Sequence, residues 1–397
     1  MRSISRIKKL LFLLLFLLLS PFRKKIQICF IVHSGDSWSG NFKVLYDDLY
    51  KAGCLVKVID KSGRIDTLKS LRQHEVDFAR SYFSTKYLLS SVIFSSHGPE
   101  PVSLILNSMP SIKSLLGDTK RLRALLWHGV GVKSHSNNWV NFSDKYFDVA
   151  FANDDYDRER LIKRFNLPSD KVVVSGYPRL KLVYGPEISL SSEDNKELAE
   201  IKKIKGSKRM ALYAPTWDVF LEDDSLLFSN IEVLLNLLEE KPCYFLGVRL
   251  HPKSSKILNL RKEEFQKVRS RAYFFLPEDF STTELLIRES DCLITDYSSI
   301  WYDYHYSGKP IFIDKKSVDK AIEIGRVSTS FGKVFKSATG KAVKGFCEIS
   351  NELNCTKALE VENEKRDFNS SKFIMEYLVR EGFLESCPRS SHSHLQP

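Results

Sequence analysis

The chain has 397 residues and a formal net charge of +11, and it is 43% hydrophobic and 27% charged. These values predict a globular protein of two or three domains and exclude collagen-like, coiled-coil and wholly disordered chains. Seven cysteines without a C-x-x-C pair argue against a disulfide framework and against a zinc ribbon. We therefore expect reduced thiols in a cytosolic compartment.

The first 25 residues carry most of the positive charge. They hold seven basic residues and no acidic one, which leaves a net charge of only +4 for the rest of the chain. This mildly basic remainder does not favour nucleic acid as a partner. Residues 10–19 are a run of ten Leu and Phe, too short for a spanning helix of about 20 residues.

We expect residues 1–25 to form an uncleaved anchor in the interface of an anionic membrane, on the cytoplasmic face of the cell membrane. The basic ends would meet the headgroups while the leucines enter the acyl boundary. A cleaved signal peptide is the second interpretation, although no small-residue cleavage site follows the run. A buried core helix is the third, but the run lacks an amphipathic period.

From Ile26 onward, short apolar runs alternate with helical patterns, which indicates an α/β doubly wound fold. Most runs are apolar on both faces, as parallel strands covered by helices should be. The expected strands are Ile26–Val32, Leu55–Ile59, Ser91–Ser95, Ala124–Trp127, Asp148–Ala152, Lys171–Val174, Met210–Ala214, Cys243–Leu250, Ala272–Leu276, Cys292–Thr295 and Pro310–Ile313. The expected helices are Phe42–Ala52, Asp155–Phe165, Ile231–Glu240, Thr283–Ser290 and Ile300–Ser307.

Eleven strands are too many for one compact sheet of this kind, so we expect two domains. The polar and charged stretch 185–208 is the best candidate for a linker between them. The expected organisation is an anchor over 1–25, an N-terminal Rossmann-like domain over 26–184, the linker, a C-terminal domain over 209–385 and a disordered tail over 386–397.

Ligands of open α/β sheets bind beyond the carboxyl ends of the strands, and one expected strand ends there in His128. Gly129, Gly131 and Lys133 follow it closely. Histidine suits general-base chemistry near neutral pH, and glycine lets a ligand approach the backbone. A loop histidine bonded only to backbone is the alternative, and the neighbouring residues favour a functional role.

Another expected strand ends in Arg249 and His251, which strand alternation places on the same face. An arginine beside a histidine suits two oxygens of a phosphate. An internal pair between Arg249 and a carboxylate is the alternative.

Two further strand ends carry polar residues. Asp296, Ser298 and Ser299 follow one strand and precede a helix, which fits either plain capping or a pyrophosphate site at a helix N-terminus. Thr216 follows another strand and could donate to a phosphate oxygen, whereas Trp217 fits the core.

Asp155 and Asp157 match the D-x-D metal signature of sugar transferases, but they open an expected helix, where acids favour the positive end of the dipole. Helix capping is therefore the favoured interpretation. The chain holds no HExxH, Walker A, GxSxG or GxGxxG pattern.

Six motifs in order resemble the CDP-glycerol glycerophosphotransferase family, the teichoic-acid primases and polymerases, from about Ser37 to Asp314. The most specific is Ser290–Ser299, followed by Lys309 and Pro310. The others are Ser39–Tyr46, Trp127-His128-Gly129 with Lys133, Gly176-Tyr177-Pro178-Arg179, Tyr213–Trp217 and Arg249-x-His251-Pro252.

The resemblance implies a GT-B fold, in which two Rossmann-like domains face a cleft and the C-terminal one binds the donor. It implies transfer of a polyol phosphate, glycerol phosphate above all, from a CDP-activated donor to a hydroxyl of a lipid-linked glycan. No cofactor or tightly bound metal is expected. The expected roles are catalysis for His128 and His251, donor binding for Arg249, Thr216, Asp296, Ser298 and Ser299, and acceptor-side contacts for Asn41, Gly129 and Lys133.

Two other functions remain open from the sequence. A GT-B glycosyltransferase that uses a nucleotide sugar would hold a diphosphate in a similar way. A membrane-bound glycan-binding protein on a decayed transferase fold would be expected to lose the polar motif residues, and these are largely present.

Overall fold

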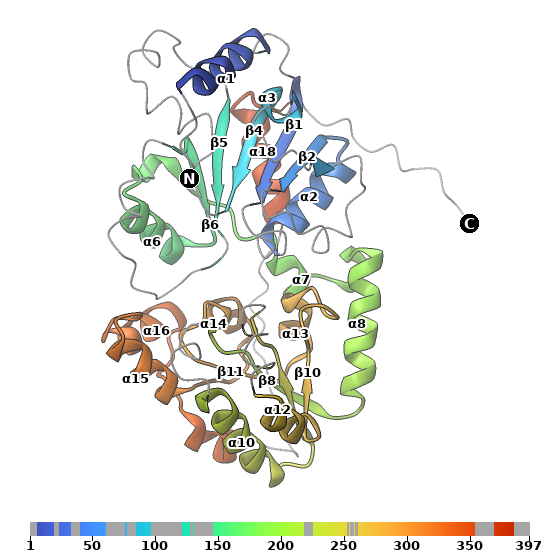
Figure 1. The fold of residues 1–397 in the computed structure, drawn as a ribbon, viewed down its shortest axis with the longest axis vertical. Coiled ribbons are helices and arrows are strands. Elements are labelled where there is room, and N and C mark those ends of the chain that lie inside the picture. The colour runs from blue at the N-terminus through green and yellow to red at the C-terminus, as the bar shows by residue number, and fades with distance from the viewer. Residues whose placement is uncertain are drawn as a thin grey trace, which may run out of the picture. The chain divides into compact units, whose positions relative to one another are not determined.

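Figure 1 shows a computed structural model of the chain, in which strands and helices alternate along the sequence. The structure describes residues 6–19, 24–32, 40–60, 76–77, 85–96, 121–127, 129, 146–217, 225–251, 254, 258, 261–353 and 369–384. Within these ranges, every helix is too short or too polar to cross a bilayer. The expected tail, 386–397, lies outside the described residues.

The chain divides into two units. The first takes the described residues of Met1–His128, Asn137–Arg179 and Asp367–Pro397, and the second takes those of Gly129–Ser136 and Leu180–Arg366. Each unit is built around one parallel sheet, so the expectation of an α/β protein with two sheets is confirmed.

The sheet of the first unit has seven strands in the order β3-β2-β1-β4-β5-β6-β7, all parallel. The order reverses direction between β1 and β4, which is the pattern of a doubly wound sheet. The strands are β1 (Lys24–Val32), β2 (Leu55–Asp60), β3 (Val76–Asp77), β4 (Ser90–Ser95), β5 (Leu122–Leu126), β6 (Val149–Ala152) and β7 (Val172–Val174).

The sheet of the second unit has five parallel strands in the order β10-β9-β8-β11-β12. Its direction reverses between β8 and β11, which lie side by side in Figure 1. The strands are β8 (Arg209–Tyr213), β9 (Tyr244–Val248), β10 (Ala272–Phe274), β11 (Cys292–Thr295) and β12 (Ile311–Ile313). All eleven expected strands are therefore present in the two sheets.

The helices begin and end at recognisable signals. Asp154 caps the helix that follows β6 by accepting the amide N–H of Asp157, and Asn166 ends it in the left-handed conformation. The helices of the first unit are α1 (Arg6–Leu19), α2 (Asn41–Lys51), α3 (Thr85–Leu88), α6 (Asp155–Phe165) and α18 (Ser370–Arg380). Those of the second are α7 (Leu180–Tyr184), α8 (Ser192–Lys205), α10 (Ser225–Glu239), α12 (Lys262–Arg269), α13 (Thr283–Glu289), α14 (Ile300–Tyr304), α15 (Lys315–Glu323), α16 (Phe331–Thr339) and α17 (Ile349–Glu352).

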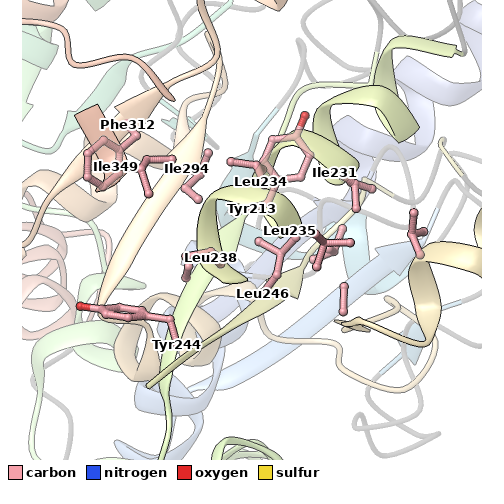
Figure 2. Packing of buried hydrophobic residues seen from close by; sticks show 14 of the residues in the cluster. Tyr213, Ile231, Leu234, Leu235, Leu238, Tyr244, Leu246, Ile294, Phe312 and Ile349 are labelled. Carbon is pink, nitrogen blue, oxygen red and sulfur yellow. The ribbon is translucent and has the colours of Figure 1, made fainter. Parts of the chain in front are cut away.

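The core of the second unit lies between α10 and the sheet. Figure 2 shows the leucines of one face of α10 pointing toward strand residues such as Leu246 and Ile294. Fully burying a leucine contributes about 1.5–3 kcal/mol, so this face alone fixes the helix on the strands. The α10 residues of this cluster include Leu227, Phe228, Ile231, Leu234, Leu235 and Leu238.

Helix α1 presents two different faces. Leu13 and Phe16 are buried against residues of β1, β2, α3 and β4, in the first unit. The guanidinium of Arg121 lies 4.9 Å from the centre of the Phe16 ring. Leu11, Leu14 and Leu18 are 55%, 52% and 61% exposed. The interpretation as a core helix therefore holds for one face of α1 only. Because successive side chains of a helix point in different directions, an unbroken apolar run places some leucines against the protein and others in solvent.

Two expected boundaries differ from the structure. Residues 192–205 of the expected linker form α8, in which Ser191 caps the helix and Leu198 and Ile201 are buried in the second unit. The C-terminal end of the expected second domain forms α18, which belongs to the first unit. There Tyr377 packs edge-to-face on Phe151, with ring centres 5.4 Å apart. In both α8 and α18, a few buried apolar residues decide where the helix packs, and these residues are hard to recognise in a segment that is polar overall.

The expectation of reduced thiols is wrong for one cysteine. Cys29, Cys54, Cys292 and Cys347 are free, whereas Cys243 is disulfide-bonded.

Candidate active site

The switch in strand order of the second sheet lies between β8 and β11, and ligands of doubly wound sheets bind in the crevice at such a point. Thr216 follows β8, and Asp296 follows β11 directly. Arg249 follows β9, the strand on the other side of β8. Three of the expected donor-binding residues therefore come from three neighbouring strand ends on one edge.

Thr216 and Asp296 bind each other. The Asp296 carboxylate accepts the Thr216 amide at 2.8 Å and the Thr216 hydroxyl at 2.7 Å, and it also accepts the amide of Ser298 at 2.8 Å. Burial raises the pKa of Asp296 to about 7, against the opposing effect of these hydrogen bonds. Both side chains are buried. Their hydrogen bonds join the loop after β8 to the loop after β11, and this pair is called the Thr216–Asp296 frame below.

Ser298 and Ser299 lie next to the Thr216–Asp296 frame, but they are less buried and their hydroxyls are not paired in the same way. Both are half-buried, and neither hydroxyl has a hydrogen bond to another residue in the part of the chain that the structure describes. Helix α14, which starts directly after Ser299, has only five residues. The two hydroxyls, more than the dipole of this short helix, are the groups available to an anion here.

Arg249 is a buried cation whose hydrogen bonds to described residues go to neutral oxygens, while the negative charges of Glu197, Glu284 and Glu278 act on it from beyond ion-pair distance. Its Nη1 donates to the carbonyls of Phe275 and Phe280, at 3.0 and 2.6 Å, and its Nε donates to the Thr283 hydroxyl at 3.2 Å. No carboxylate of the described residues lies within ion-pair distance, so the alternative of an internal ion pair does not hold among them. Burial lowers the pKa of Arg249 to about 10, and it remains charged at neutral pH.

His251 lies two residues further along, at the same edge. Its ring centre is 5.8 Å from that of Trp217, which follows Thr216. Trp217 is only half-buried, so the expectation that it belongs to the core holds in part. The two rings bring the loops after β8 and β9 together beside Arg249.

In the first unit, Asn41 joins two of the sequence motifs. Its Nδ2 donates to the carbonyl of Trp127 at 2.9 Å, and its Oδ1 accepts the amide of Arg179 at 3.2 Å. The Trp127 carbonyl belongs to the peptide bond that leads to His128. Asn41 is buried, so we assign it to holding this peptide plane rather than to direct contact with an acceptor.

A second polar cluster surrounds Asp157. Its Oδ2 accepts the Tyr177 hydroxyl at 2.6 Å and the Asn153 amide at 2.9 Å. Burial raises the pKa of Asp157 to about 6. The carboxylate thus locks the turn that contains Gly176 and Tyr177 onto the start of α6, which agrees with a structural role for the D-x-D pattern. Among the described residues, no group of His, Cys, Asp and Glu is arranged to hold a metal ion.

Gly129 is buried and belongs to the second unit, where it lies against Ser299. His128 and Lys133 lie outside the described residues. Sequence analysis missed Asn153 and Tyr177 as partners of Asp157. The available signal was that Asn153 follows β6 directly and Tyr177 lies three residues after β7, because the carboxyl ends of adjacent parallel strands share an edge.

The family model described as CDP-Glycerol:Poly(glycerophosphate) glycerophosphotransferase matches residues 13–375. The chain belongs to this family. The resemblance inferred from the six motifs is therefore confirmed, and with it the assignment to the transferases of this class.

Relatives and solved structures agree with membership of the glycerophosphotransferase family. A teichoic acid poly(glycerol phosphate) polymerase of Staphylococcus epidermidis is 28% identical over 53% of this chain and 28% of its own length. A teichoic acid glycerol-phosphate transferase of Staphylococcus aureus is 25% identical over 77% of this chain and 78% of its own. The wall teichoic acid polymerase TagF is 16% identical with a TM-score of 0.57, over 95% of this chain and 98% of that chain, and shares the fold.

Proposed function

We propose that this chain transfers glycerol phosphate from CDP-glycerol to a hydroxyl of a lipid-linked glycan or of a growing teichoic acid polymer. The acceptor oxygen attacks the β-phosphorus in line and forms a new P–O bond. The bond between that phosphorus and the bridging oxygen breaks, and CMP leaves with this oxygen. Such a step depends on positioning and charge neutralisation more than on covalent help from the protein.

The arrangement of the edge formed by β9, β8 and β11 carries this proposal. Arg249 is a buried cation with no carboxylate in direct ion-pair contact among the described residues, so a ligand anion could pair with it. The hydroxyls of Ser298 and Ser299 are available beside the Thr216–Asp296 frame. A donor diphosphate would supply the negative charge and the acceptor oxygens that these groups lack.

His128 is the proposed general base. It would accept the proton of the attacking hydroxyl as the P–O bond forms, a contribution of roughly 10²–10⁴ in rate. Asn41 supports this role, because it fixes the peptide bond between Trp127 and His128. We assign His251 to the diphosphate together with Arg249, and Lys133 to the acceptor side, whereas the contact of Gly129 with Ser299 places this glycine beside the proposed donor site.

A donor screen tests the proposed activity. The purified protein is incubated with CDP-glycerol, with CDP-ribitol and with UDP-sugars, and release of CMP or UDP is followed in the presence of a lipid-linked glycan acceptor. We expect CMP release with CDP-glycerol. Turnover of UDP-sugars alone would contradict the proposal and favour a glycosyltransferase.

We also propose that α1 binds an anionic membrane surface. Leu11, Leu14 and Leu18 are spaced by three and four residues, so they share the face of α1 opposite to the one that packs on the first unit. Seven basic residues flank or begin this helix in the sequence, and each such residue near an anionic surface is worth about 1 kcal/mol. Exposed leucines between basic ends suit an interfacial helix.

Vesicle sedimentation tests this second proposal. The triple variant Leu11→Ser, Leu14→Ser, Leu18→Ser should lose binding to vesicles that contain phosphatidylglycerol. Ile188→Ser is the matched control, since Ile188 is 94% exposed in the second unit. Retention of vesicle binding by the triple variant, at low and at high salt, would place the anchor elsewhere.

A further inference from the structure

Gly129 and Ser299 fit together with no space for a side chain on the glycine. A Cβ placed on Gly129 would lie 2.7 Å from the Ser299 Oγ and 3.1 Å from the Ser299 Cβ. Real Cβ atoms essentially never come within 3.0 Å of a non-bonded heavy atom, so one of the two residues would have to shift. The Ser299 side chain therefore occupies the volume that any other residue at position 129 would need.

This constraint is one of space and not of backbone conformation. Several other glycines of the described residues have a positive φ, which L-residues rarely adopt, but Gly129 is not among them. An alanine at position 129 could keep the same backbone. Among the described residues, it would conflict only with the serine side chain that lies against it.

The main response of Ser299 to such a conflict would be a turn of its side chain. Its carbonyl accepts the amide of Tyr302 at 3.0 Å, and its φ and ψ of −63° and −10° are helical, so the start of α14 holds its backbone. Its hydroxyl has no hydrogen bond to another described residue. A methyl group at position 129 would therefore turn the Oγ into another staggered rotamer and shift the backbone by a few tenths of an ångström.

We propose that Gly129 is a positioning residue for the donor: the absence of its side chain keeps the Ser299 hydroxyl in the rotamer that meets the donor diphosphate. This inference rests on the proposed role of Ser299 in donor binding. Gly129 directly follows His128, the proposed base. This contact explains why a glycine follows the histidine in the sequence.

A double-mutant cycle tests this inference with Gly129→Ala, Ser299→Gly and the double variant. Gly332→Ala is the matched control, because Gly332 also lies in the second unit, has no positive φ and has nothing within 4 Å of an added Cβ. The readouts are the Kd of CDP-glycerol by calorimetry, the KM and kcat, and the Tm without ligand.

We expect Gly129→Ala and Ser299→Gly each to raise the Kd of CDP-glycerol by about tenfold, the equivalent of one lost hydrogen bond to a charged group. The double variant should bind no more weakly than Ser299→Gly, because the second change has no remaining hydroxyl to displace. The loss should appear in KM more than in kcat, and Gly332→Ala should bind CDP-glycerol as the unchanged protein does.

The donor affinities of Gly129→Ala and Ser299→Gly together separate failure of this inference from failure of the proposed donor site. Unchanged donor affinity in Gly129→Ala, with a loss in Ser299→Gly, would overturn the positioning role alone. Unchanged affinity in Ser299→Gly would overturn the donor role of Ser299 and, with it, this inference. The steric contact is measured independently: Gly129→Ala should lower the Tm less in the Ser299→Gly background, and equal losses in both backgrounds would contradict it.

Discussion

The polar residues at the carboxyl edges of the two sheets are arranged in different ways. In the first unit, Asn41 and Asp157 each bind two partners, and these partners belong to turns of the same unit. In the second unit, Thr216 and Asp296 bind each other, while the neighbouring hydroxyls of Ser298 and Ser299 have no hydrogen-bond partner among the described residues.

This difference separates polar residues that hold loops from those that can bind a ligand. A buried polar group without a partner costs about 1–3 kcal/mol, so buried groups are normally paired within the protein. The hydroxyls of Ser298 and Ser299 have no such partner among the described residues, so a ligand could supply their hydrogen bonds. The comparison therefore supports the proposal that the donor binds at the edge of the second sheet and that Asn41 and Asp157 hold loops in place.

The largest effect on donor binding is expected from Arg249→Met, which removes the buried cation from the donor edge. The Kd of CDP-glycerol should rise by about 100-fold, since a hydrogen bond to a charged group contributes about 1.5–3 kcal/mol. The Tm should fall as well, because the carbonyls of Phe275 and Phe280 lose their donor. Arg271→Met is the control, since Arg271 forms an exposed ion pair with Glu239. Equal donor affinities in both variants would contradict the placement of the diphosphate beside Arg249.

A pH dependence of stability is expected from Asp157. Its pKa is about 6 in the folded chain, against an ordinary value of 3.8, because burial disfavours the carboxylate. Between pH 4 and 6 the folded state binds more protons than the unfolded state, so the free energy of unfolding falls as pH rises. The fall from this group is on the order of 3 kcal/mol and is complete above the folded pKa.

Asp157→Asn should remove this component, because one amide oxygen can still accept from Tyr177 and Asn153. The measurement is urea denaturation of both proteins from pH 4 to 7. Asp155→Asn, at an exposed position in the same helical turn, is the control. If the free energy of unfolding changes with pH in the same way for Asp157→Asn and for the unchanged protein, this carboxyl does not titrate as described.

The smallest effect is expected from Asn41→Leu, which keeps the size of the side chain and removes both hydrogen bonds. We expect a loss of about 1–3 kcal/mol in stability and a fall in kcat of about tenfold, since the peptide bond to His128 is no longer held. The KM for CDP-glycerol should not change. Lys51→Gln, at an exposed position on the same helix, is the control. A change confined to KM would place Asn41 in donor binding.

Much of the fold could be predicted from the sequence, because buried parallel strands are short apolar runs. The exception is β3, which has only the residues Val76 and Asp77 and therefore no run to detect. The sequence of helix α8 resembles a linker because only a few of its positions are apolar. Helix α18 was assigned to the wrong unit because chain order does not show the contact of Tyr377 with Phe151.

For the site, the sequence predicted which polar residues follow the strands, but not which of them pair. Thr216 and Asp296 are 80 residues apart, and either could have bound a phosphate. Only the folded chain shows that they satisfy each other and leave the serines available. The contact between Gly129 and Ser299 depends on two loops and has no signal in either motif alone.

One comparison of two variants tests the central claim most directly: donor titration by calorimetry together with single-turnover rates for Ser298→Ala and His128→Ala. The account predicts that Ser298→Ala weakens binding of CDP-glycerol by about tenfold or more, since one hydrogen bond to a charged group is lost. It predicts that His128→Ala binds CDP-glycerol nearly normally and turns it over roughly 10²–10⁴ times more slowly. Loss of donor binding in His128→Ala, with normal chemistry once the donor is bound, would contradict the division of roles between the two units.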